Sequence, residues 1–459
     1  MTSQKYANID ELESFLKAYP AIESIDAVFP DQSGVLRGKR LTLDHARTLF
    51  GGGFQLPGSM LLLSVTGSCL DPGGKGVSDG DPDVPVRPVA GSLKTTPWSP
   101  TLRGQVMIQF LDAAEQPNRF EPRQILRQVV ERFADLGLHP VVACELEFSL
   151  IDRERNEQGA PVRPQSPVAG RRHASTQLMS LAYVDDFGDY VNDVTRTCQK
   201  LQIPVTALNA EYGGDQFEIN LRHVPDAVLS ADHAVQLMQV VQGVATRHNI
   251  RASFMAKPYA ATAGSGMHWH VSLLDEGGNN VFDDGTEAGT GALQHAAAGV
   301  LKTMPEAMAF YAPNINSYRR FKPGLFVPMT RSWGYNNRSV AVRVPAGHAR
   351  DRRLEYRVPG ADANPYLALA ALLAGMHHGI QQQLDAPAAS NGNACIKRDR
   401  GLPLRLHDAL RCLRNAKILP DYIGAEYCVV YANCKQLELD AFLDDISTRE
   451  YSWYLRPDA

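Results

Sequence analysis

Residues 264 to 273 read Gly-Ser-Gly-Met-His-Trp-His-Val-Ser-Leu, and the side chains alternate in character from residue 267 onward. His268, His270 and Ser272 fall on one face of a strand, and the apolar residues between them fall on the other. The apolar face suits burial, so the polar face must meet water, charge or a metal ion. Two imidazoles and a hydroxyl in one row suit metal ions and phosphate oxygens. If this strand stood alone, we would interpret it as solvent-facing.

The same alternation recurs in three other stretches, which weakens that solvent-facing interpretation. In each stretch two or three polar side chains share a face and apolar residues alternate with them. The polar residues are Glu145 and Glu147 in 141–150, Gln216, Glu218 and Asn220 in 215–220, and Arg353, Glu355 and Arg357 in 353–358.

The polar faces together hold many carboxylates, and Glu211 lies just before the stretch 215–220. Like charges on neighbouring strands destabilise a sheet unless something neutralises them. Oxygen-rich ligand sets with one imidazole suit Mg²⁺ or Mn²⁺ better than Zn²⁺. The interspersed arginines suit phosphates and carboxylates, which they bind in a planar fork. A carboxylate cage with arginines therefore indicates metal-bound polyphosphate and phosphoryl transfer.

Composition is that of a cytosolic enzyme. The chain has 459 residues, which is enough for two or three domains. Its charge is balanced, with a formal net charge of −4, and no basic stripe argues for nucleic-acid binding. Its first residues contain no apolar signal core, and no apolar run approaches membrane-spanning length. The seven cysteines show no CxxC spacing, and we expect them to be reduced.

Helices and strands are expected to alternate along the chain. A helix over 9–18 and strands over 22–29 and 34–43 come first, followed by loops and short strands from 51 to 104. A helix should begin near Pro122, with Ile125, Val129, Phe133 and Leu136 on its buried face. We place a domain boundary between residues 117 and 118. Later helices are expected over 185–200, 226–248, 291–309 and 364–384.

With these residues in view, the chain resembles the glutamine synthetase superfamily over nearly its whole length. Each motif alone is weak or moderate, but their order and spacing are specific. The motifs are Glu145-Leu-Glu147, Glu211-Tyr-Gly-Gly-Asp-Gln216-Phe-Glu218, Gly264-Ser-Gly-Met-His268-Trp-His270, Asn316-Ser-Tyr-Arg-Arg320, Trp333-Gly-Tyr-Asn-Asn-Arg338-Ser, Arg343-Val-Pro, and Arg353-Leu-Glu355-Tyr-Arg357 with Asn364-Pro-Tyr-Leu.

The resemblance implies an α+β fold, with a small N-terminal β-grasp domain over 1–117 and a larger catalytic domain with a curved antiparallel sheet over 118–459. It implies ATP and at least two Mg²⁺ or Mn²⁺ ions per active site, with glutamate and a small amine as substrates. It also implies a homo-dodecamer of two hexameric rings, in which a neighbour's N-terminal domain completes each active site.

The family's residue roles carry over where the motifs match. One metal ion would be held by Glu147, Glu211 and Glu218, and a second by Glu145, His268 and Glu355. The ATP side would be formed by His270, Ser272, Arg343 and Arg353. Glutamate would be bound by Gly264, Arg320 and Arg357, and Arg338 would contact the phosphoryl group in transfer.

Such enzymes phosphorylate the γ-carboxylate of glutamate and then let an amine displace phosphate. The sequence departs from true glutamine synthetases where the amine binds. Phe326 stands where the family has a glutamate, Pro57 replaces the ammonium-site aspartate, and Ala263 replaces an asparagine. Residues 392–410 contain no tyrosine for adenylylation. Losing both acids weakens a site for ammonium and leaves space for an organic amine, as in γ-glutamylpolyamine synthetases and related γ-glutamylamine ligases of catabolic pathways.

The sequence leaves polyamines and monoamines open. A polyamine could be oriented by an acidic rim, for which Asp185, Asp186 and Asp189 are candidates, whereas a monoamine would use apolar contact with Phe326 and Leu325. A true glutamine synthetase is the alternative within the same class. An inactive binding or structural homologue is the alternative from another class, and the retained carboxylate cluster argues against it.

Overall fold

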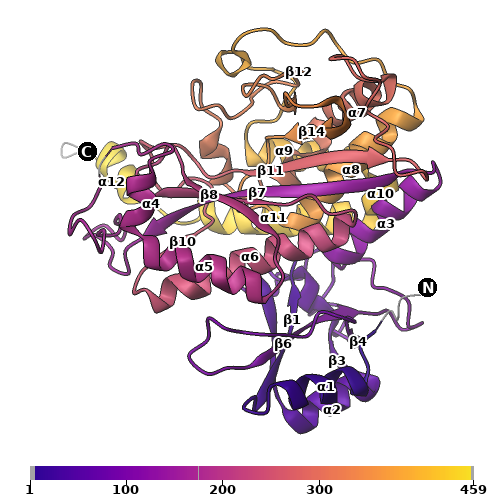
Figure 1. The fold of residues 1–459 in the computed structure, drawn as a ribbon, viewed down its shortest axis with the longest axis vertical. Helices are drawn as coiled ribbons and strands as arrows, with labels where there is room; N and C mark the ends of the chain where they lie inside the picture. Colours follow the sequence, from indigo (N-terminus) through magenta and orange to yellow (C-terminus); the bar gives the residue numbers. More distant parts are fainter. Residues whose placement is uncertain (1–5, 174, 456–459) are drawn as a thin grey trace.

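A computed structural model describes residues 6–173 and 175–455 of the protein. A six-stranded sheet with two helices packed on it forms the lower part of the molecule in Figure 1. Its order is β2-β1-β6-β4-β3, with β5 also paired to β6, and β1 runs parallel to β6. Leu12, Ile25, Leu49 and Phe110 lie in its own apolar core. The elements are α1 (Ile9–Ala18), β1 (Ser24–Pro30), β2 (Leu36–Thr42), α2 (Leu43–Gly52), β3 (Phe54–Pro57), η1 (Gly58–Leu62), β4 (Asp83–Pro88), β5 (Lys94–Thr95) and β6 (Gly104–Phe110).

An eight-stranded sheet spans the larger part of the molecule. Its order is β12-β13-β14-β11-β7-β9-β8, with β10 also paired to β7. The expected antiparallel sheet is present, and among its described strands β12 with β13 is the one parallel pair, at the edge. The strands are β7 (His139–Ile151), β8 (Val205–Ala210), β9 (Gln216–Leu221), β10 (Arg251–Ser253), β11 (Met267–Leu274), β12 (Trp333–Tyr335), β13 (Val342–Val344) and β14 (Leu354–Tyr356).

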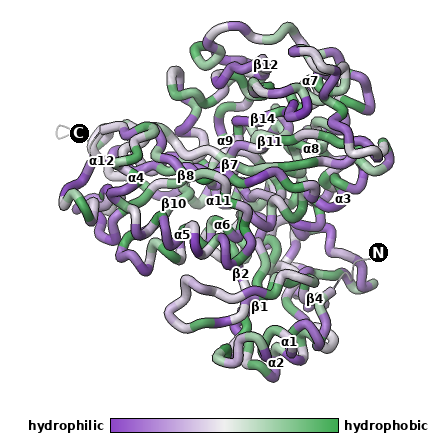
Figure 2. Tube along the Cα trace, viewed as in Figure 1, coloured by the Kyte–Doolittle hydropathy of each residue, from purple (hydrophilic) through white to green (hydrophobic). Residues whose placement is uncertain are grey.

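Helices pack against this second sheet and bury its apolar face. Met267, Trp269, Val271 and Leu273 are fully buried there, as the alternation predicts. Helix α8 is apolar along most of its length (Figure 2) and packs against α3 and α7. The helices are α3 (Pro122–Ala134), α4 (Leu181–Asp186), α5 (Gly188–Lys200), α6 (Ala227–Arg247), α7 (Gly291–Tyr311), η2 (Ser317–Arg320), η3 (Ala349–Asp351), α8 (Pro365–Gln381), η4 (Ala394–Ile396), α9 (Leu406–Arg414), α10 (Leu419–Ile423), α11 (Ala425–Leu443) and α12 (Thr448–Tyr454).

Asn364 ties the two sheets together at the start of α8. Its side-chain oxygen accepts hydrogen bonds from the backbone N–H groups of Tyr366 and Leu367, and Pro365 occupies the first helical position. Its side-chain amide donates to the Asp31 carbonyl in the turn between β1 and β2 at 2.9 Å. The cap that begins the most buried helix therefore also fixes the first sheet against it.

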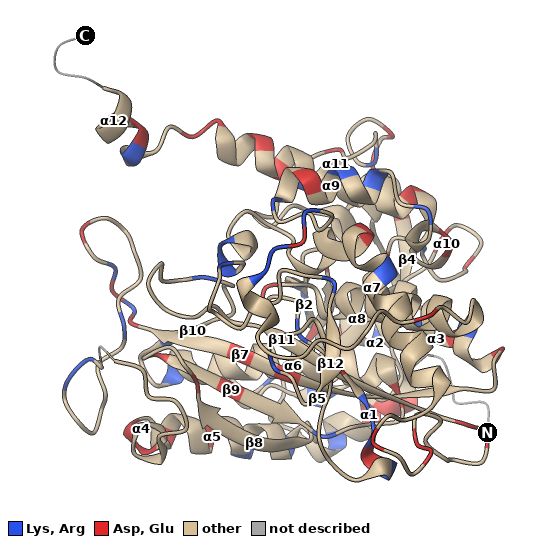
Figure 3. Ribbon diagram, turned by 90° about the horizontal axis from the view of Figure 1, so that it is seen from above, with Lys and Arg blue, Asp and Glu red and all other residues tan. Residues whose placement is uncertain are grey.

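The C-terminal segment extends away from the rest of the chain, and α12 is its outermost described helix in Figure 3. A capping box at Ser447 and Glu450 begins that helix. Large apolar side chains are exposed along this segment: Phe442, Leu443, Ile446, Tyr451, Trp453, Tyr454 and Leu455. A monomer rarely exposes so many contiguous apolar side chains, so this segment has the composition of a contact surface.

Most expected elements are present within a few residues of their expected ends, and the α+β class is confirmed. The expectation that Leu136 lies on the buried face of this helix is wrong, because α3 ends at Ala134 and Leu136 is exposed beyond it. The boundary between 117 and 118, and the β-grasp assignment for the first part, stay predictions. Over residues 6–173 and 175–455, no helix combines the length and apolar character needed to cross a membrane.

Candidate active site

Four neighbouring strands of the larger sheet bring the predicted polar faces together. The order β14-β11-β7-β9 places His268 opposite Glu145, and His270 opposite Glu355. On the other side of β7, Glu147 lies opposite Glu218. Residues that are far apart in the sequence therefore form one continuous polar surface, as the four alternating stretches predict.

Two groups of potential metal ligands lie on this surface. In each group one ligand atom per residue can be chosen so that all lie within 4.8 Å of one another. The first group is Glu145, His268 and Glu355, which matches one expected set. The second is Glu147, Glu218 and His268, so the structure brings His268 near the second expected set and leaves Glu211 outside it. The carboxylate of Glu211 instead accepts hydrogen bonds from the Asn209 side chain and the Tyr212 N–H, each at 3.1 Å.

On the Glu147 and Glu218 side of the surface, the carboxyl groups oppose one another's ionisation. Burial, followed by the charges of Glu145, Glu147 and Glu211, raises the pKa of Glu218 to about 9. Burial and the charge of Glu147 raise the pKa of Glu211 to about 7. A cation placed among these carboxyl groups would remove that repulsion.

The Glu145 and Glu355 side is compensated by basic groups. Burial opposes ionisation of Glu145, but His268 Nδ1 at 3.3 Å and His270 Nε2 at 2.9 Å hold the pKa of its carboxyl well below the usual range. Burial also opposes ionisation of Glu355, but Arg357 and the two histidines lower its pKa to about 2. Glu355 is fully buried between its ion pairs with Arg343, at 2.6 Å, and Arg357. Glu355 is thus an ionised carboxylate whose charge is shared among fixed partners.

Gln216 connects the parts of the site. Its side-chain amide donates to Glu147 Oε2 and to the Gly264 carbonyl, each at 3.0 Å. Its side-chain oxygen accepts from the Gly213 N–H at 3.0 Å. The side chain is buried, so these bonds fix the carboxylate of Glu147 relative to the turn that carries Glu211. The sequence alternation places Gln216 on the polar face but gives no sign of this role.

A cavity of about 810 Å³ opens over the polar surface. Residues from β7, β8, β9 and β11 line its acidic part, and loop residues line the remainder. Of the fifteen residues predicted for the site, ten line the cavity: Glu145, Glu147, Glu211, Glu218, Gly264, His268, Arg320, Phe326, Arg338 and Arg357.

The other five predicted residues lie beside the cavity and do not line it. Glu355 is fully buried, and Arg343 is held by Glu355 and by the Asn336 side-chain oxygen, 3.1 Å away. Arg353 Nε donates to His270 Nδ1 at 3.1 Å, so these two predicted ATP residues touch one another. Ser272 follows on the same face of β11.

Arginine side chains enclose the cavity in two different ways. Arg320 is buried and donates through Nη1 to the Val358 carbonyl at 3.0 Å, and burial lowers its pKa. Arg338 is exposed to solvent on the wall, which leaves it able to reorient toward a ligand. A Cβ at Gly264 would lie 2.6 Å from the Ala256 carbonyl oxygen and from Arg320 Cγ, so only glycine fits beside this arginine.

An apolar wall forms the outer part of the cavity. It comprises Leu178, Met179, Leu325, Phe326 and Val327. Phe326 is 56% exposed, and its backbone φ is +52°, which is rare for a bulky side chain. This wall includes Phe326 as expected, but no pattern in the sequence indicates that Leu178 and Met179 belong to it.

The acidic rim expected at Asp185, Asp186 and Asp189 is not part of the cavity lining. Asp186 instead lies 2.5 Å from His173 Nε2, in a contact that holds a separate loop. Asp185 and Asp186 lie in α4, and Asp189 lies in the first turn of α5. The expectation that they would orient an amine in this cavity is therefore wrong.

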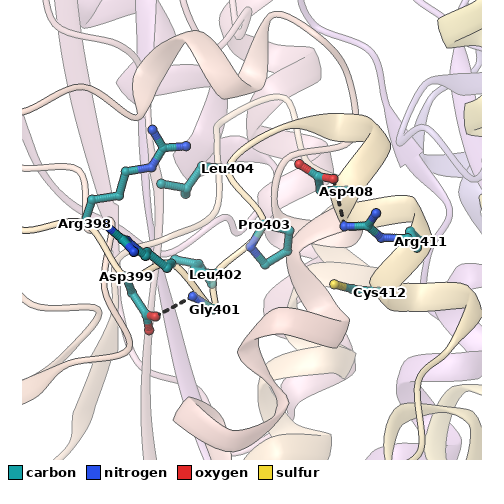
Figure 4. A pocket seen from close by; sticks show the side chains of 10 residues that line it. Arg398, Asp399, Gly401, Leu402, Pro403, Leu404, Asp408, Arg411 and Cys412 are labelled. Carbon is teal, nitrogen blue, oxygen red and sulfur yellow. Dashed lines mark hydrogen bonds and ion pairs between the residues drawn. The ribbon is translucent and has the colours of Figure 1, made fainter.

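A second, smaller cavity of about 370 Å³ lies between the 398–404 loop and α9 (Figure 4). Arg411 there is paired with Asp408 at 3.0 Å, and Asp399 is paired with Arg331 at 2.7 Å. None of the residues predicted for the active site lines it. Its two carboxylates, Asp399 and Asp408, are each paired with an arginine, so it lacks the converging carboxylates of the larger cavity.

Known proteins resemble this chain in sequence and in fold. The family model described as "Glutamine synthetase, catalytic domain" matches residues 119–454. Gamma-glutamylputrescine synthetase PuuA of Escherichia coli is 38% identical, over 97% of this chain and 94% of that protein. Gamma-glutamylethanolamide synthetase GlnA4 of Streptomyces coelicolor is 32% identical, over 95% of this chain and 92% of that protein. The solved structure of a GmaS/ADP complex has a TM-score of 0.82 and 27% identity, covering 97% of this chain and 99% of that chain.

Proposed function

This chain belongs to the glutamine synthetase family and is an ATP-dependent glutamate–amine ligase, and on that premise we propose that its amine is an organic primary amine. The observation that carries the proposal is the apolar outer wall of an otherwise acidic cavity, with Phe326 exposed in it. Its relatives named for putrescine and ethanolamide products support the same class of substrate. A polyamine is favoured, and a monoamine is the closest competitor.

The carboxylates fit divalent metal ions. Glu147 and Glu218 face one another, and the raised pKa of Glu218 reflects the cost of a second negative charge there; a hard cation would replace the proton and let both carboxylates ionise. We propose that Glu147, Glu211 and Glu218 hold one Mg²⁺ or Mn²⁺ ion and that Glu145, His268 and Glu355 hold another. When bound, such ions supply positive charge next to the phosphates of ATP.

The basic residues would bind the phosphates of ATP and the glutamate. We assign His270, Ser272, Arg343 and Arg353 to the ATP side, and Gly264, Arg320 and Arg357 to glutamate. Arg338, exposed on the cavity wall, would turn toward the γ-phosphoryl group during transfer and stabilise the charge spread over its oxygens.

The reaction then follows two steps. The γ-carboxylate of glutamate attacks the γ-phosphorus of ATP, releasing ADP and giving γ-glutamyl phosphate, whose phosphate is a good leaving group. A neutral primary amine attacks the acyl carbon, phosphate leaves, and the amine loses a proton to give a γ-glutamyl amide. A primary alkylamine has an ordinary pKa of about 10.4, so it must shed a proton before it attacks.

Phe326 is the residue that we assign to the choice of amine. The loop 323–328 that carries it contains no acidic residue, so it offers the amine an apolar contact and no partner for a small cation. Ammonium gains nothing from an apolar contact, whereas the methylene groups of an alkylamine do. The wall therefore favours organic amines over ammonium.

The proposed assembly is a homo-dodecamer of two hexameric rings. The exposed apolar side chains at 442–455 support an assembly larger than the monomer, because exposed apolar surface of this extent is typical of contacts between subunits. Size measurement in solution by light scattering tests this proposal, and a monomer would contradict it.

The direct test of the function is product formation with each amine separately. Purified protein is incubated with ATP, glutamate, Mg²⁺ or Mn²⁺ and either ammonium, putrescine, spermidine or small alkylamines, and the products are identified by mass spectrometry. A larger kcat/KM for an organic amine supports the proposal. Preference for ammonium would identify a true glutamine synthetase, and no product with any amine would identify an inactive homologue.

A further inference from the structure

Two bulky apolar residues share a rare backbone conformation and one cavity. Nine non-glycine residues in the described chain have positive φ, and seven of them are Asp, Glu, Asn or Gln. The two apolar ones are Met179, with φ of +57°, and Phe326, with φ of +52°. Both line the cavity over the acidic surface. Unfavourable φ values in large side chains persist where neighbouring structure enforces them, and they cluster at ligand clamps.

The structure around each residue enforces this conformation. Met179 donates its N–H to the Ala210 carbonyl at 3.0 Å, and the next residue, Ser180, caps α4 by accepting from the Tyr183 N–H. On the other loop, Leu325 packs against the large apolar core and Val327 is buried, so Phe326 between them is directed outward. Each side chain is thus held out of the core by anchored neighbours.

The side chains of Met179 and Phe326 are largely exposed to solvent, although both are apolar and line a cavity. Met179 is 69% exposed and Phe326 is 56% exposed, although both border a cavity whose floor is carboxylates. They come from separate loops, one before α4 and one between η2 and β12. The cavity therefore has a charged inner part and an apolar outer part built from two loops.

We infer that Met179 is a second amine-selecting residue, which together with Phe326 clamps the carbon chain of the amine. The inference rests on the proposed function and extends it from the amino group to the aliphatic part of the substrate. The reacting nitrogen lies toward the carboxylate floor, and the methylene groups lie between the two apolar side chains. The ligand class is a primary amine with an unbranched aliphatic stem of several carbons.

The test is the dependence of kcat/KM on chain length. Each methylene moved from water into apolar contact contributes about fourfold. In the wild-type protein, kcat/KM for n-alkyl primary amines should rise by about that factor per carbon from methylamine until the clamp is filled. In Met179→Ala and Phe326→Ala the loss should grow with chain length, so the slope becomes shallower.

Matched variants separate the clamp from a general effect on folding. Met179→Leu keeps the apolar volume and should restore the slope. Leu181→Ala removes an apolar side chain that is 76% exposed in the same segment but does not line the cavity, and it should leave the slope and the size of the assembly unchanged. Each variant is examined for amine kinetics and for particle size by light scattering.

The outcomes are distinguishable. If the wild-type protein forms no γ-glutamyl amide, the proposed function fails. If it ligates amines but the slope is the same in Met179→Ala as in the wild type, the clamp is wrong while the function stands. If Met179→Ala changes the size of the assembly and leaves the slope unchanged, the residue contacts a second copy of the chain and the inference is overturned.

Discussion

Glu147 on β7 lies directly opposite Glu218 on β9, in a sheet where both side chains point to the same face. Two facing carboxylates destabilise an antiparallel pair unless a cation or a proton intervenes. The raised pKa of Glu218 reflects this conflict. Gln216 fixes one of the two carboxylates in place, and the site keeps its acids close together at a cost in stability. That arrangement is what a metal-dependent phosphoryl-transfer site requires.

Removing a carboxylate from either donor group should abolish ligation. Glu147→Ala and Glu355→Ala leave phosphoryl charge poorly neutralised, and each should lower kcat by on the order of a hundredfold or more. The exposed Glu131→Ala is the matched control. Thermal unfolding should also show that Mn²⁺ raises the midpoint of the wild-type protein and not that of Glu147→Ala. Near-normal turnover in both variants at saturating metal would contradict the two-metal assignment.

Gln216→Ala should weaken metal activation without unfolding the protein. The amide orients Glu147, and loss of a residue that orients a metal ligand costs about 10- to 100-fold in metal affinity. The concentration of Mg²⁺ that gives half-maximal activity should rise by that factor, while kcat at saturating Mg²⁺ recovers in part. Gln239→Ala serves as the control: it breaks a side-chain amide pair with Gln105, and neither residue lines the cavity. Equal metal requirements in the two variants would disprove the positioning role of Gln216.

Phe326→Glu should shift the preference toward ammonium. A carboxylate at this exposed position in the cavity wall can hold a small cation and accept its proton, and the apolar contact is lost. The ratio of kcat/KM for putrescine to that for ammonium should fall at least tenfold. Phe326→Leu keeps the wall apolar and should retain most of the ratio. An unchanged ratio in Phe326→Glu would show that this loop does not select the amine.

The buried pair of Arg123 and Asp232 should matter for stability and not for chemistry. Arg123 donates to both carboxylate oxygens of Asp232 at 2.9 and 2.8 Å, and the Tyr366 hydroxyl donates to one of them at 2.7 Å. Asp232→Ala leaves a buried guanidinium unpaired and should lower the free energy of unfolding by about 3–5 kcal/mol. Breaking the exposed pair with Asp408→Ala should cost less than about 1 kcal/mol. Urea unfolding compares them, and similar losses in both variants would refute the distinction.

The sequence was sufficient to predict which residues share the polar surface. Strand alternation fixes the face of each side chain, so Glu145, Glu147, His268 and Glu355 could be grouped before their strands were paired. The pairing itself depended on the resemblance to a known family. The register then confirmed that the faces coincide.

Features set by turns and by long-range contacts could not be predicted in this way. Glu211 lies in the turn before β9, where alternation does not apply, and its orientation depends on bonds from Asn209 and Tyr212. The left-handed conformation of Met179 depends on a bond to Ala210, 31 positions away in sequence. Asp186 was misplaced because its partner, His173, lies on a loop whose path has no pattern in the sequence.

The central claim, that this ligase joins glutamate to an organic amine, is tested most directly by competition in one reaction. Putrescine and ammonium are supplied at equal concentration with ATP, Mg²⁺ and glutamate, and mass spectrometry measures the ratio of γ-glutamylputrescine to glutamine at low conversion. The account predicts a ratio of at least ten to one in favour of γ-glutamylputrescine, or of the γ-glutamyl alkylamide when a monoamine replaces putrescine. Glutamine as the main product against every amine would contradict it.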